Sequence, residues 1–390
     1  MSERIAIVMS GGGSKGAFQV GALKRIYEAG IRPQIVCGTS VGALNGAKLA
    51  EGTPTVIQEL EGLWRSLQKN ADVLTWSPTF QDLFKSLGRL AHREVNDLDD
   101  LQALQGALEQ ALIRRLAILI GTGVAAPGIF GALLQVIQLL GLRRRVVDVV
   151  QAFSGALGGE SLFVTDPLKA KILQYLDVSK VVTSGIELRV TGVDFQTGEL
   201  VLMDQNHPDL TEAILASSVQ PVFMEPRHPL AAARDHQVYD GGVREITPLQ
   251  AAADLGADHV YMILAGSLKT PQVGPIKGIF PIIMRTIDIF TSEIARNDIH
   301  IQQEVNRLAA LGRDIEEAMP PTRDVDDPVM RGVRTLQERP VLNRQPVNLT
   351  VIEPTFDPFD GSLDFDPVKI AQSIAHGYEL TGQILGNGTS

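Results

Sequence analysis

Short apolar runs alternate with helical patterns along the first fifty residues of the chain. An apolar run at Ile5–Met9 ends in a serine and three glycines, which is typical of a buried strand followed by a turn. Apolar positions three and four apart then predict a helix over Lys15–Glu28. Gln34–Cys37 indicates a second strand, and the small residues of Ser40–Ala50 indicate a second helix. This order favours βαβ units and a parallel sheet.

The same patterns continue through the second half of the chain. Further strands are predicted at Ile186–Asp194, Glu199–Asp204, Val238–Tyr239, His259–Leu264 and Val347–Ile352. Further helices are predicted at 53–110, from Asp166-Pro167 onward, at Glu212–Ser217, Pro248–Leu255, 276–318 and Asp366–Ile384. We therefore expect a three-layer α/β/α fold with a mostly parallel central sheet. One domain is predicted over 1–355, with a helical insertion around 53–160, and 356–390 is predicted to be a C-terminal helix and tail packing on it.

Residues 116–142 are the most unusual stretch, because they contain no charged residue. Their length would allow a membrane span, but Pro127 and several glycines interrupt them. Arginines at both ends, including 143–145, give no orientation signal. We expect an apolar helical hairpin near 111–145 that contacts a lipid surface through 116–145 or caps a site. A core hairpin and a true span are the alternatives.

Charge and cysteine content narrow the classes of protein that the chain could represent. The net charge is −10 and the isoelectric point is about 5.3, which argues against a general nucleic-acid binder. Cys37 is the single cysteine, so no intrachain disulfide can form, as suits a reducing compartment. The run Ile5–Met9 is too short for a signal-peptide core. We expect a cytoplasmic protein with peripheral membrane association, and no metal or other cofactor.

Gly38-Thr39-Ser40-Val41-Gly42 forms a G-x-S-x-G sequence between a predicted strand and a predicted helix. A serine on such a sharp turn exposes its hydroxyl, and glycines are needed where the turn leaves no room for side chains. The first residues of the following helix offer free N–H groups that favour developing negative charge. The context predicts a nucleophilic serine, although a plain Gly-Ser turn would give the same letters.

The glycines that follow the first strand form a second motif. Gly11 to Gly16 formally match the G-x-G-x-x-G of dinucleotide-binding turns. The second strand runs directly into Gly38, however, without the acidic residue that would hold a ribose, and Ala17 after Gly16 excludes a phosphate-binding P-loop. Consecutive glycine amides also suit a tetrahedral oxyanion. If both glycine turns end neighbouring parallel strands, they face each other.

Asp240 follows a short predicted strand and precedes Gly241 and Gly242. A serine needs a base to act as a nucleophile, and this aspartate can supply it. By itself the motif would also describe a hairpin turn.

In this order the three motifs resemble the patatin-like phospholipase family. The resemblance covers roughly residues 5–265, with 70–160 unmatched, and includes Val190–Asp194, Ala216-Ser217-Ser218 and Pro248-Leu249. It implies a catalytic domain in which Ser40 is the nucleophile and Asp240 is the base. The oxyanion hole would be formed by the amides of Gly11, Gly12 and Gly13, with that of Val41. The residues that support these motifs would be Lys15, Gly16, Gly38, Gly42, Gly241 and Gly242.

The resemblance also implies a phospholipid or lysophospholipid substrate. Two positions depart from the family pattern: Lys15 stands where arginine is commoner, and Ile246 stands where asparagine is frequent.

An acyltransferase with the same dyad and a catalytically silent lipid-binding protein remain as alternatives. The chain order Ser40, Asp240, His259 would suit a hydrolase triad, but His259 begins a predicted strand and we expect a strand-edge role for it.

Overall fold

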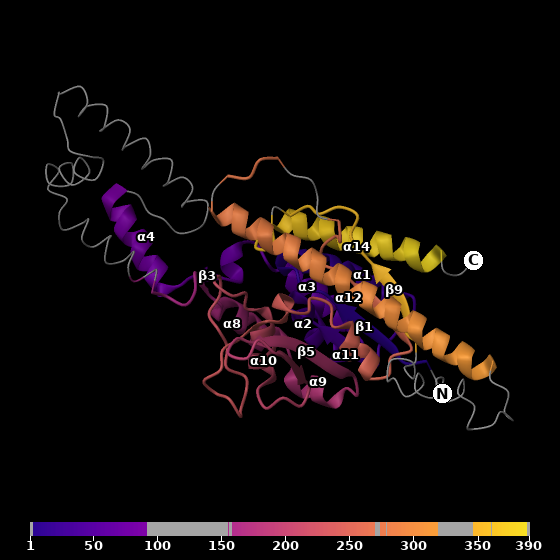
Figure 1. The fold of residues 1–390 in the computed structure, drawn as a ribbon. Coiled ribbons are helices and arrows are strands. Elements are labelled where there is room, and N and C mark those ends of the chain that lie inside the picture. The colour runs from indigo at the N-terminus through magenta and orange to yellow at the C-terminus, as the bar shows by residue number, and fades with distance from the viewer. Residues whose placement is uncertain are drawn as a thin grey trace. The chain divides into compact units, whose positions relative to one another are not determined.

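Figure 1 shows the computed structural model of the chain. The structure describes residues 3–91, 155, 158–269, 274–277, 279–318, 346–359 and 361–387. The predicted apolar hairpin at 116–142 lies outside these ranges. Within them, no helix has the length and apolar character needed to cross a membrane.

The described chain forms two compact units. The larger unit comprises residues 1–73, 167–220 and 226–390, and the smaller one 74–166 and 221–225. The division of the chain into 1–355 and 356–390 stays a prediction.

The larger unit is built on a seven-stranded sheet. Its strands are β1 (Ile5–Met9), β2 (Ile35–Gly38), β5 (Glu187–Asp194), β6 (Leu200–Asp204), β7 (Val238–Asp240), β8 (His259–Ile263) and β9 (Asn348–Ile352). The order is β6-β5-β2-β1-β8-β9, and β7 pairs with β5 on the edge opposite to β6, beyond the end of β2. All pairs are parallel except those of β5 with β6 and β7. The predicted mostly parallel sheet is confirmed.

The register places both glycine motifs at one edge of this sheet. Met9 at the end of β1 lies opposite Gly38 at the end of β2 and opposite Ile263 at the end of β8. Because these strands are parallel, their carboxyl ends share an edge, which is where open α/β sheets bind ligands. His259 pairs with Ile5 at the other end of the strands.

Helices flank both faces of the sheet. They are α1 (Ala17–Glu28), α2 (Val41–Leu49), α3 (Val56–Arg65), α8 (Asp166–Tyr175), α9 (Val178–Thr183), α10 (Leu210–Ser218), α11 (Leu249–Asp254), α12 (Ile279–Ala318) and α14 (Pro367–Asn387). Short 3-10 turns form η1 (Gly13–Gly16), η2 (Asn70–Asp72) and η3 (Gly241–Val243).

Alternation along the central strands decides which helix covers which face. Ala6, Val8 and Cys37 belong to a buried cluster with α11 and with Ile299 of α12. Side chains of the intervening positions point to the other face, where Met9 lies close to Gly46 of α2. This two-sided burial explains why the strands read as continuous apolar runs. Cys37 is a buried hydrophobe, as its position before the turn indicated.

Helix α14 packs along α1, and the two can be followed side by side in Figure 1. Glycines allow the close approach: a Cβ on Gly21 would lie 1.9 Å from the Ile374 carbonyl oxygen, and one on Gly377 would lie 2.1 Å from that of Phe18. The amino-terminal and carboxyl-terminal parts of the described chain therefore share one core.

The smaller unit contains the two-residue strands β3 (Thr75–Trp76) and β4 (Phe163–Val164), which pair antiparallel, and the helix α4 (Pro78–Ala91). The Trp76 and Phe163 rings stack with centroids 4.6 Å apart. Neither strand was predicted, because two residues carry no readable alternation.

Candidate active site

Ser40 lies on a strained turn between β2 and α2. Its φ is 56° and its ψ is −126°, a backbone conformation that a non-glycine residue adopts only where its surroundings impose it. The two flanking glycines make the turn sterically feasible. A Cβ on Gly38 would lie 2.3 Å from the Gly42 carbonyl oxygen, and one on Gly42 would lie 2.2 Å from that of Met9. A strained turn of this kind between a strand and a helix is the backbone geometry that a nucleophile elbow requires.

Helix α10 anchors the backbone of this turn. The Ser40 N–H donates to Ser217 Oγ at 3.0 Å, and the Ser218 hydroxyl donates to the Ser40 carbonyl oxygen at 3.3 Å. Thr39 Oγ1 and Thr191 Oγ1 lie 2.7 Å apart, which ties the same turn to β5. The serine backbone is therefore held from two elements that are distant in sequence.

Asp240 ends β7 and lies against Ser40. Strand pairing places Asp240 opposite Gly192 of β5, and its backbone N–H donates to the Val219 carbonyl oxygen at 2.8 Å. The Asp240 Oδ1 accepts the Gly242 N–H at 2.7 Å, and the carboxylate also accepts a hydrogen bond from the Ser40 side chain. The structure thus brings together two residues that lie two hundred positions apart in the chain.

The environment of Asp240 makes its carboxyl group unusually basic. Its side chain is 3% exposed, and burial raises its pKa to about 6 against the opposing effects of the hydrogen bonds from Ser40 and Gly242. A carboxyl group with a pKa near neutrality is a better proton acceptor than an ordinary aspartate and is still ionised at pH 7.

The loop after β1 contacts the same point. A Cβ on Gly11 would lie 3.0 Å from the Ser40 Cβ, so the loop backbone packs against the serine side chain. The Gly11 N–H donates to the Ile246 carbonyl oxygen at 3.3 Å. Within the described ranges, the N–H groups of Gly12, Gly13 and Val41 have no backbone or side-chain acceptor. These three amides are therefore available to an anion.

A segment near the carboxyl end of the described chain supports this loop. Gly13 has φ +58°, and a Cβ there would lie 2.0 Å from the Ser362 carbonyl oxygen. That carbonyl accepts the Ser14 N–H at 2.8 Å, and the Ser14 hydroxyl donates to the Gly361 carbonyl oxygen at 3.0 Å. The glycine loop is thus held by residues some 350 positions later in the chain, which we call the carboxyl-terminal strap (residues 357–359 and 361–364).

Lys15 connects the glycine loop to the same strap and to α12. Its Nζ lies 3.0 Å from Asp357 Oδ2 and 3.6 Å from Asp288 Oδ1, and its side chain is mostly buried. Lysine gives a point charge that two carboxylates can share, without the planar fork of arginine. Its role in this structure is to hold the loop between two other elements.

The remaining motif residues fill tight positions around the turn. A Cβ on Gly16 would lie 2.4 Å from Val41 Cγ2, and one on Gly241 would lie 2.1 Å from Thr191 Oγ1. Ile246, at the position where the family often has asparagine, packs its Cδ1 against both Gly11 and Gly242. It therefore acts as an apolar spacer between the two glycine motifs.

His259 is far from this cluster. It lies at the amino end of β8, stacks on Tyr261 with centroids 4.4 Å apart, and its Nε2 lies 2.9 Å from Thr350 Oγ1. This confirms the strand-edge role and excludes a triad with Ser40. In the part of the chain that the structure describes, no group of three or more histidine, cysteine or acidic side chains could hold a metal ion.

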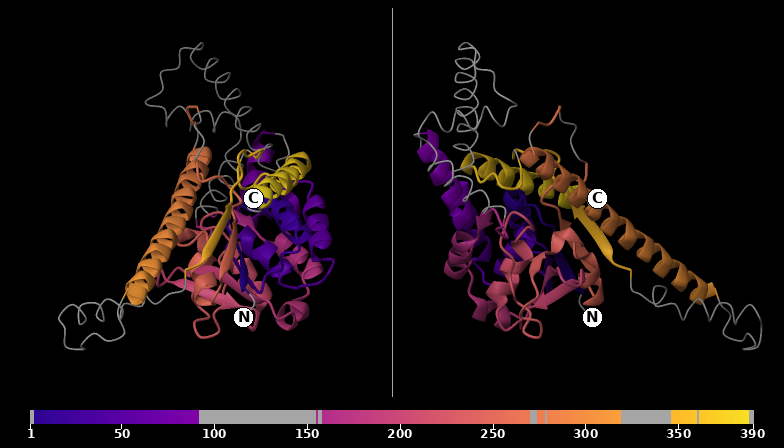
Figure 2. Two further views of the ribbon diagram at one scale, coloured as in Figure 1. Left: turned by 90° about the vertical axis from the view of Figure 1, so that its right-hand side faces the viewer. Right: turned by 60° about the vertical axis from the view of Figure 1, so that its left-hand side comes forward.

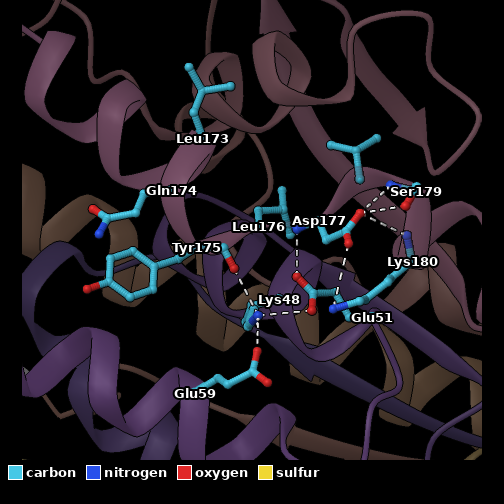
Figure 3. Close-up of a pocket in the computed structure, with 11 residues that line it drawn as sticks. Lys48, Glu51, Glu59, Leu173, Gln174, Tyr175, Leu176, Asp177, Ser179 and Lys180 are labelled. Carbon is cyan, nitrogen blue, oxygen red and sulfur yellow. Dashed lines mark hydrogen bonds and ion pairs between the residues drawn. The ribbon is translucent and has the colours of Figure 1, made fainter.

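A cavity of about 620 Å³ lies at the opposite end of α2 from Ser40 (Figure 3). Its centre is Lys48, whose ammonium group donates to Glu51, Glu59 and the Tyr175 carbonyl oxygen. All three donors of the lysine are therefore used within the protein. We interpret this cluster as a structural connection between α2, α3 and the segment after α8.

A family model described as "Patatin-like phospholipase" matches residues 7–253. The match covers more than half of the chain and includes Ser40, Asp240 and both glycine motifs. The chain belongs to the patatin-like phospholipase family. The fold and the placement of the motifs at one sheet edge agree with this assignment.

Individual relatives resemble short parts of the chain. A lysophospholipase (nte1) of Aspergillus terreus is 46% identical over 52 residues, which is 13% of this chain and 3% of that protein. Patatin-like phospholipase domain-containing protein 7 of Rattus norvegicus is 51% identical over 47 residues, 12% of this chain and 4% of that protein. The triacylglycerol lipase SDP1L of Arabidopsis thaliana is 38% identical over 66 residues, 17% and 8% respectively. The matches thus span only a small share of these longer relatives.

Among solved structures, VipD of Legionella pneumophila is similar at 15% identity. The comparison covers 99% of this chain and 67% of that chain, with a TM-score of 0.41.

Sequence motifs predicted the residues at the centre of the candidate site, but not the residues that support them. Ser217 stood in a stretch that resembles the family, yet nothing in the sequence linked it to the Ser40 amide. Asp288, Asp357 and Ser362 lie outside the family match and carry no motif. Only the topology, which pairs β9 with β8 and packs α14 along α1, brings the strap to the glycine loop.

Proposed function

We propose that this patatin-like protein is a lipid acyl hydrolase that cleaves carboxylic esters of phospholipids or lysophospholipids. Ser40 is the nucleophile, and Asp240 is its base. The observation that carries the proposal is the hydrogen bond between the Ser40 hydroxyl and a buried carboxylate whose pKa is raised to about 6. Such a pair needs no histidine, because the carboxyl group itself is basic enough to take the proton.

The proposed reaction begins when the Ser40 oxygen attacks the ester carbonyl carbon and its proton passes to the Asp240 carboxylate. The carbonyl oxygen becomes an oxyanion that accepts hydrogen bonds from the amides of Gly12, Gly13 and Val41. Each such donor is typically worth about 3 kcal/mol of barrier. Gly11, whose N–H already has an acceptor in Ile246, acts as the backbone that packs against Ser40.

The tetrahedral intermediate then collapses and releases the alcohol, which takes its proton from Asp240. This leaves the acyl group bound to the Ser40 oxygen and the aspartate ionised again. A water molecule next gives its proton to Asp240 and attacks the acyl carbon, and the fatty acid leaves as the serine regains its proton. Hydrolysis and transfer to another acceptor differ only in which nucleophile performs this second step.

The proposal is tested by comparing the wild type with Ser40→Ala on phospholipids and lysophospholipids, with and without vesicles. Asp240→Asn is expected to lose hydrolysis, while His259→Gln is expected to keep it. A fluorophosphonate probe is expected to label Ser40 in the folded protein. Failure to label folded wild type would support a silent lipid-binding protein, and transfer to an added alcohol in preference to water would support an acyltransferase.

A further inference from the structure

Helix α12 has an apolar surface on the side that faces away from the core. Its buried positions, Ala295, Ile299, Gln302 and Ala309, follow one another at spacings of four, three and seven, which places them on one side of the helix. On the opposite side large hydrophobic side chains are exposed: Phe290 by 63%, Ile301 by 59% and Leu311 by 50%. A surface helix normally carries charged residues there, so the second apolar side requires an explanation.

The exposed apolar residues repeat every seven positions. One column contains Ile287, Ile294, Ile301 and Leu308, and a second column, three residues further on, contains Phe290, Asn297, Glu304 and Leu311, with Ile283 one heptad before Phe290. Two columns at this offset have the spacing of a coiled-coil seam, in which the first column is apolar throughout and the second is apolar at Ile283, Phe290 and Leu311. A seven-residue repeat also drifts slowly around a straight helix, which is why the first column moves from half-buried to exposed along α12.

The helix is long enough to present this seam to a partner. Its 40 residues correspond to about 60 Å. In Figures 1 and 2 it runs as one continuous helix whose carboxyl-terminal part extends past the sheet. A length well above 25 residues with a heptad pattern is itself typical of helix–helix association.

We propose that this seam binds α12 of a second copy of the chain in antiparallel orientation, to form a dimer. The polar residues within the stripe, Asn297 and Glu304, disfavour a lipid surface, which requires a continuous apolar face with basic flanks. A coiled-coil seam, by contrast, tolerates single polar positions at a cost in stability, and these positions restrict the registers that can form. This inference does not depend on the proposed hydrolase activity.

Charge complementarity selects the second copy and the orientation. When the two helices are antiparallel and centred on each other, Asn297 lies opposite Ile301 of the second copy. Phe290 then lies opposite Leu308 of the second copy. Beside the seam, Glu293 comes opposite Arg307 of the second copy, and the two-fold axis repeats this attractive pair. Within one chain these residues form exposed pairs with Arg296 and Glu304, which are weak and can exchange partners.

The helix that forms this interface also contacts the candidate active site. Asp288 pairs with Lys15 on the glycine loop, and Asp298 accepts hydrogen bonds from the Thr247 N–H and hydroxyl. Dimer formation therefore steadies an element that holds the loop from one side.

The test is the mass of the full chain in solution, by light scattering after size exclusion. The wild type is expected to be a dimer at tens of micromolar, and the double variant Phe290→Glu with Ile301→Glu a monomer. Val368→Glu is the matched control, because Val368 is as exposed as Phe290 but lies on α14. Glu293→Arg is expected to weaken association about tenfold or more, and adding Arg307→Glu is expected to restore it.

Three results would overturn the proposal. The first is a wild-type chain that is monomeric throughout this concentration range. The second is a Phe290→Glu, Ile301→Glu variant that loses binding to phosphatidylcholine vesicles while the mass stays unchanged, which would assign the stripe to a lipid surface. The third is a Phe290→Glu, Ile301→Glu variant that is less thermally stable than the wild type while both proteins are monomeric. This result would mean that the chain's own residues cover the stripe. Failure of the Arg307→Glu rescue would overturn the antiparallel register.

Discussion

Replacing Asp240 by asparagine is expected to stabilise the protein at neutral pH while it abolishes hydrolysis. The carboxyl group is 3% exposed, and burial raises its pKa from 3.8 to about 6. Asparagine has the same shape and can keep both contacts, since its carbonyl oxygen accepts the Gly242 N–H and its amide faces the Ser40 hydroxyl. The substitution therefore removes mainly the cost of burying a negative charge.

The magnitude follows from the two pKa values. Because the folded pKa lies above the unfolded one, the folded state binds more protons between them, and the free energy of unfolding falls as pH rises. For a shift from 3.8 to about 6, the loss between about pH 4.5 and pH 7.5 amounts to roughly 2 kcal/mol. The variant lacks this titration, so its stability relative to the wild type should rise by that amount over the same window.

Urea unfolding at several pH values measures this difference directly, because the other titrating groups cancel between the two proteins. Ser40→Ala is the control: it should lose hydrolysis like Asp240→Asn yet keep the pH dependence, since its carboxylate remains. Removing the serine hydrogen bond should even extend the fall in stability to higher pH. A stability difference between wild type and Asp240→Asn that does not change with pH would refute the buried, ionising carboxylate.

Three further predictions concern the supports of the site and of the fold. Gly13→Ala is expected to reduce hydrolysis about 100-fold, because the new methyl group displaces the strap and misplaces an oxyanion donor. Gly30→Ala is the control, since Gly30 also has a positive φ but lies in open space; it should lower the free energy of unfolding by about 1 kcal/mol and leave hydrolysis intact. Lys48→Met is expected to lower the free energy of unfolding, measured by chemical denaturation, by about 3–5 kcal/mol, because it leaves the buried charge of Glu51 without its partner. A loss below about 1 kcal/mol would contradict the structural role of this cluster. His236 donates a hydrogen bond to the buried Asp194, and this bond raises the pKa of the imidazole. His236→Gln should therefore be less stable than the wild type below about pH 6.5 and match it once the pH exceeds the folded pKa. An imidazole titration by NMR that shows no upward shift of this pKa would contradict the prediction.

The sheet and the centre of the site could be predicted from the sequence, because both rest on local signals. Ile5–Met9 and His259–Leu264 are apolar runs with glycine or polar ends, and such runs become central parallel strands whatever surrounds them. The G-x-S-x-G turn carries its own steric requirement, since no other residues fit at Gly38 and Gly42. The topology then brought Asp240 to the serine.

The supports could not be predicted, because their signals are not local. Lys15 and Lys48 look alike as lysines on or near short helices, yet one connects the glycine loop to the strap and the other fixes the far end of α2. Ser362 contributes through its backbone carbonyl, and sequence identity does not indicate where a carbonyl points. The short strands β3 and β4 exist only because they pair with each other.

The pairing of the first strand and helix with late elements has a consequence for biosynthesis. A ribosome delivers β1 and α1 long before their neighbours β8 and α14 have been translated. At about 5–20 residues per second, these early apolar segments wait many seconds for their partners. The nascent polypeptide is therefore a natural client for chaperones that bind exposed hydrophobic segments, and slower translation should increase its aggregation.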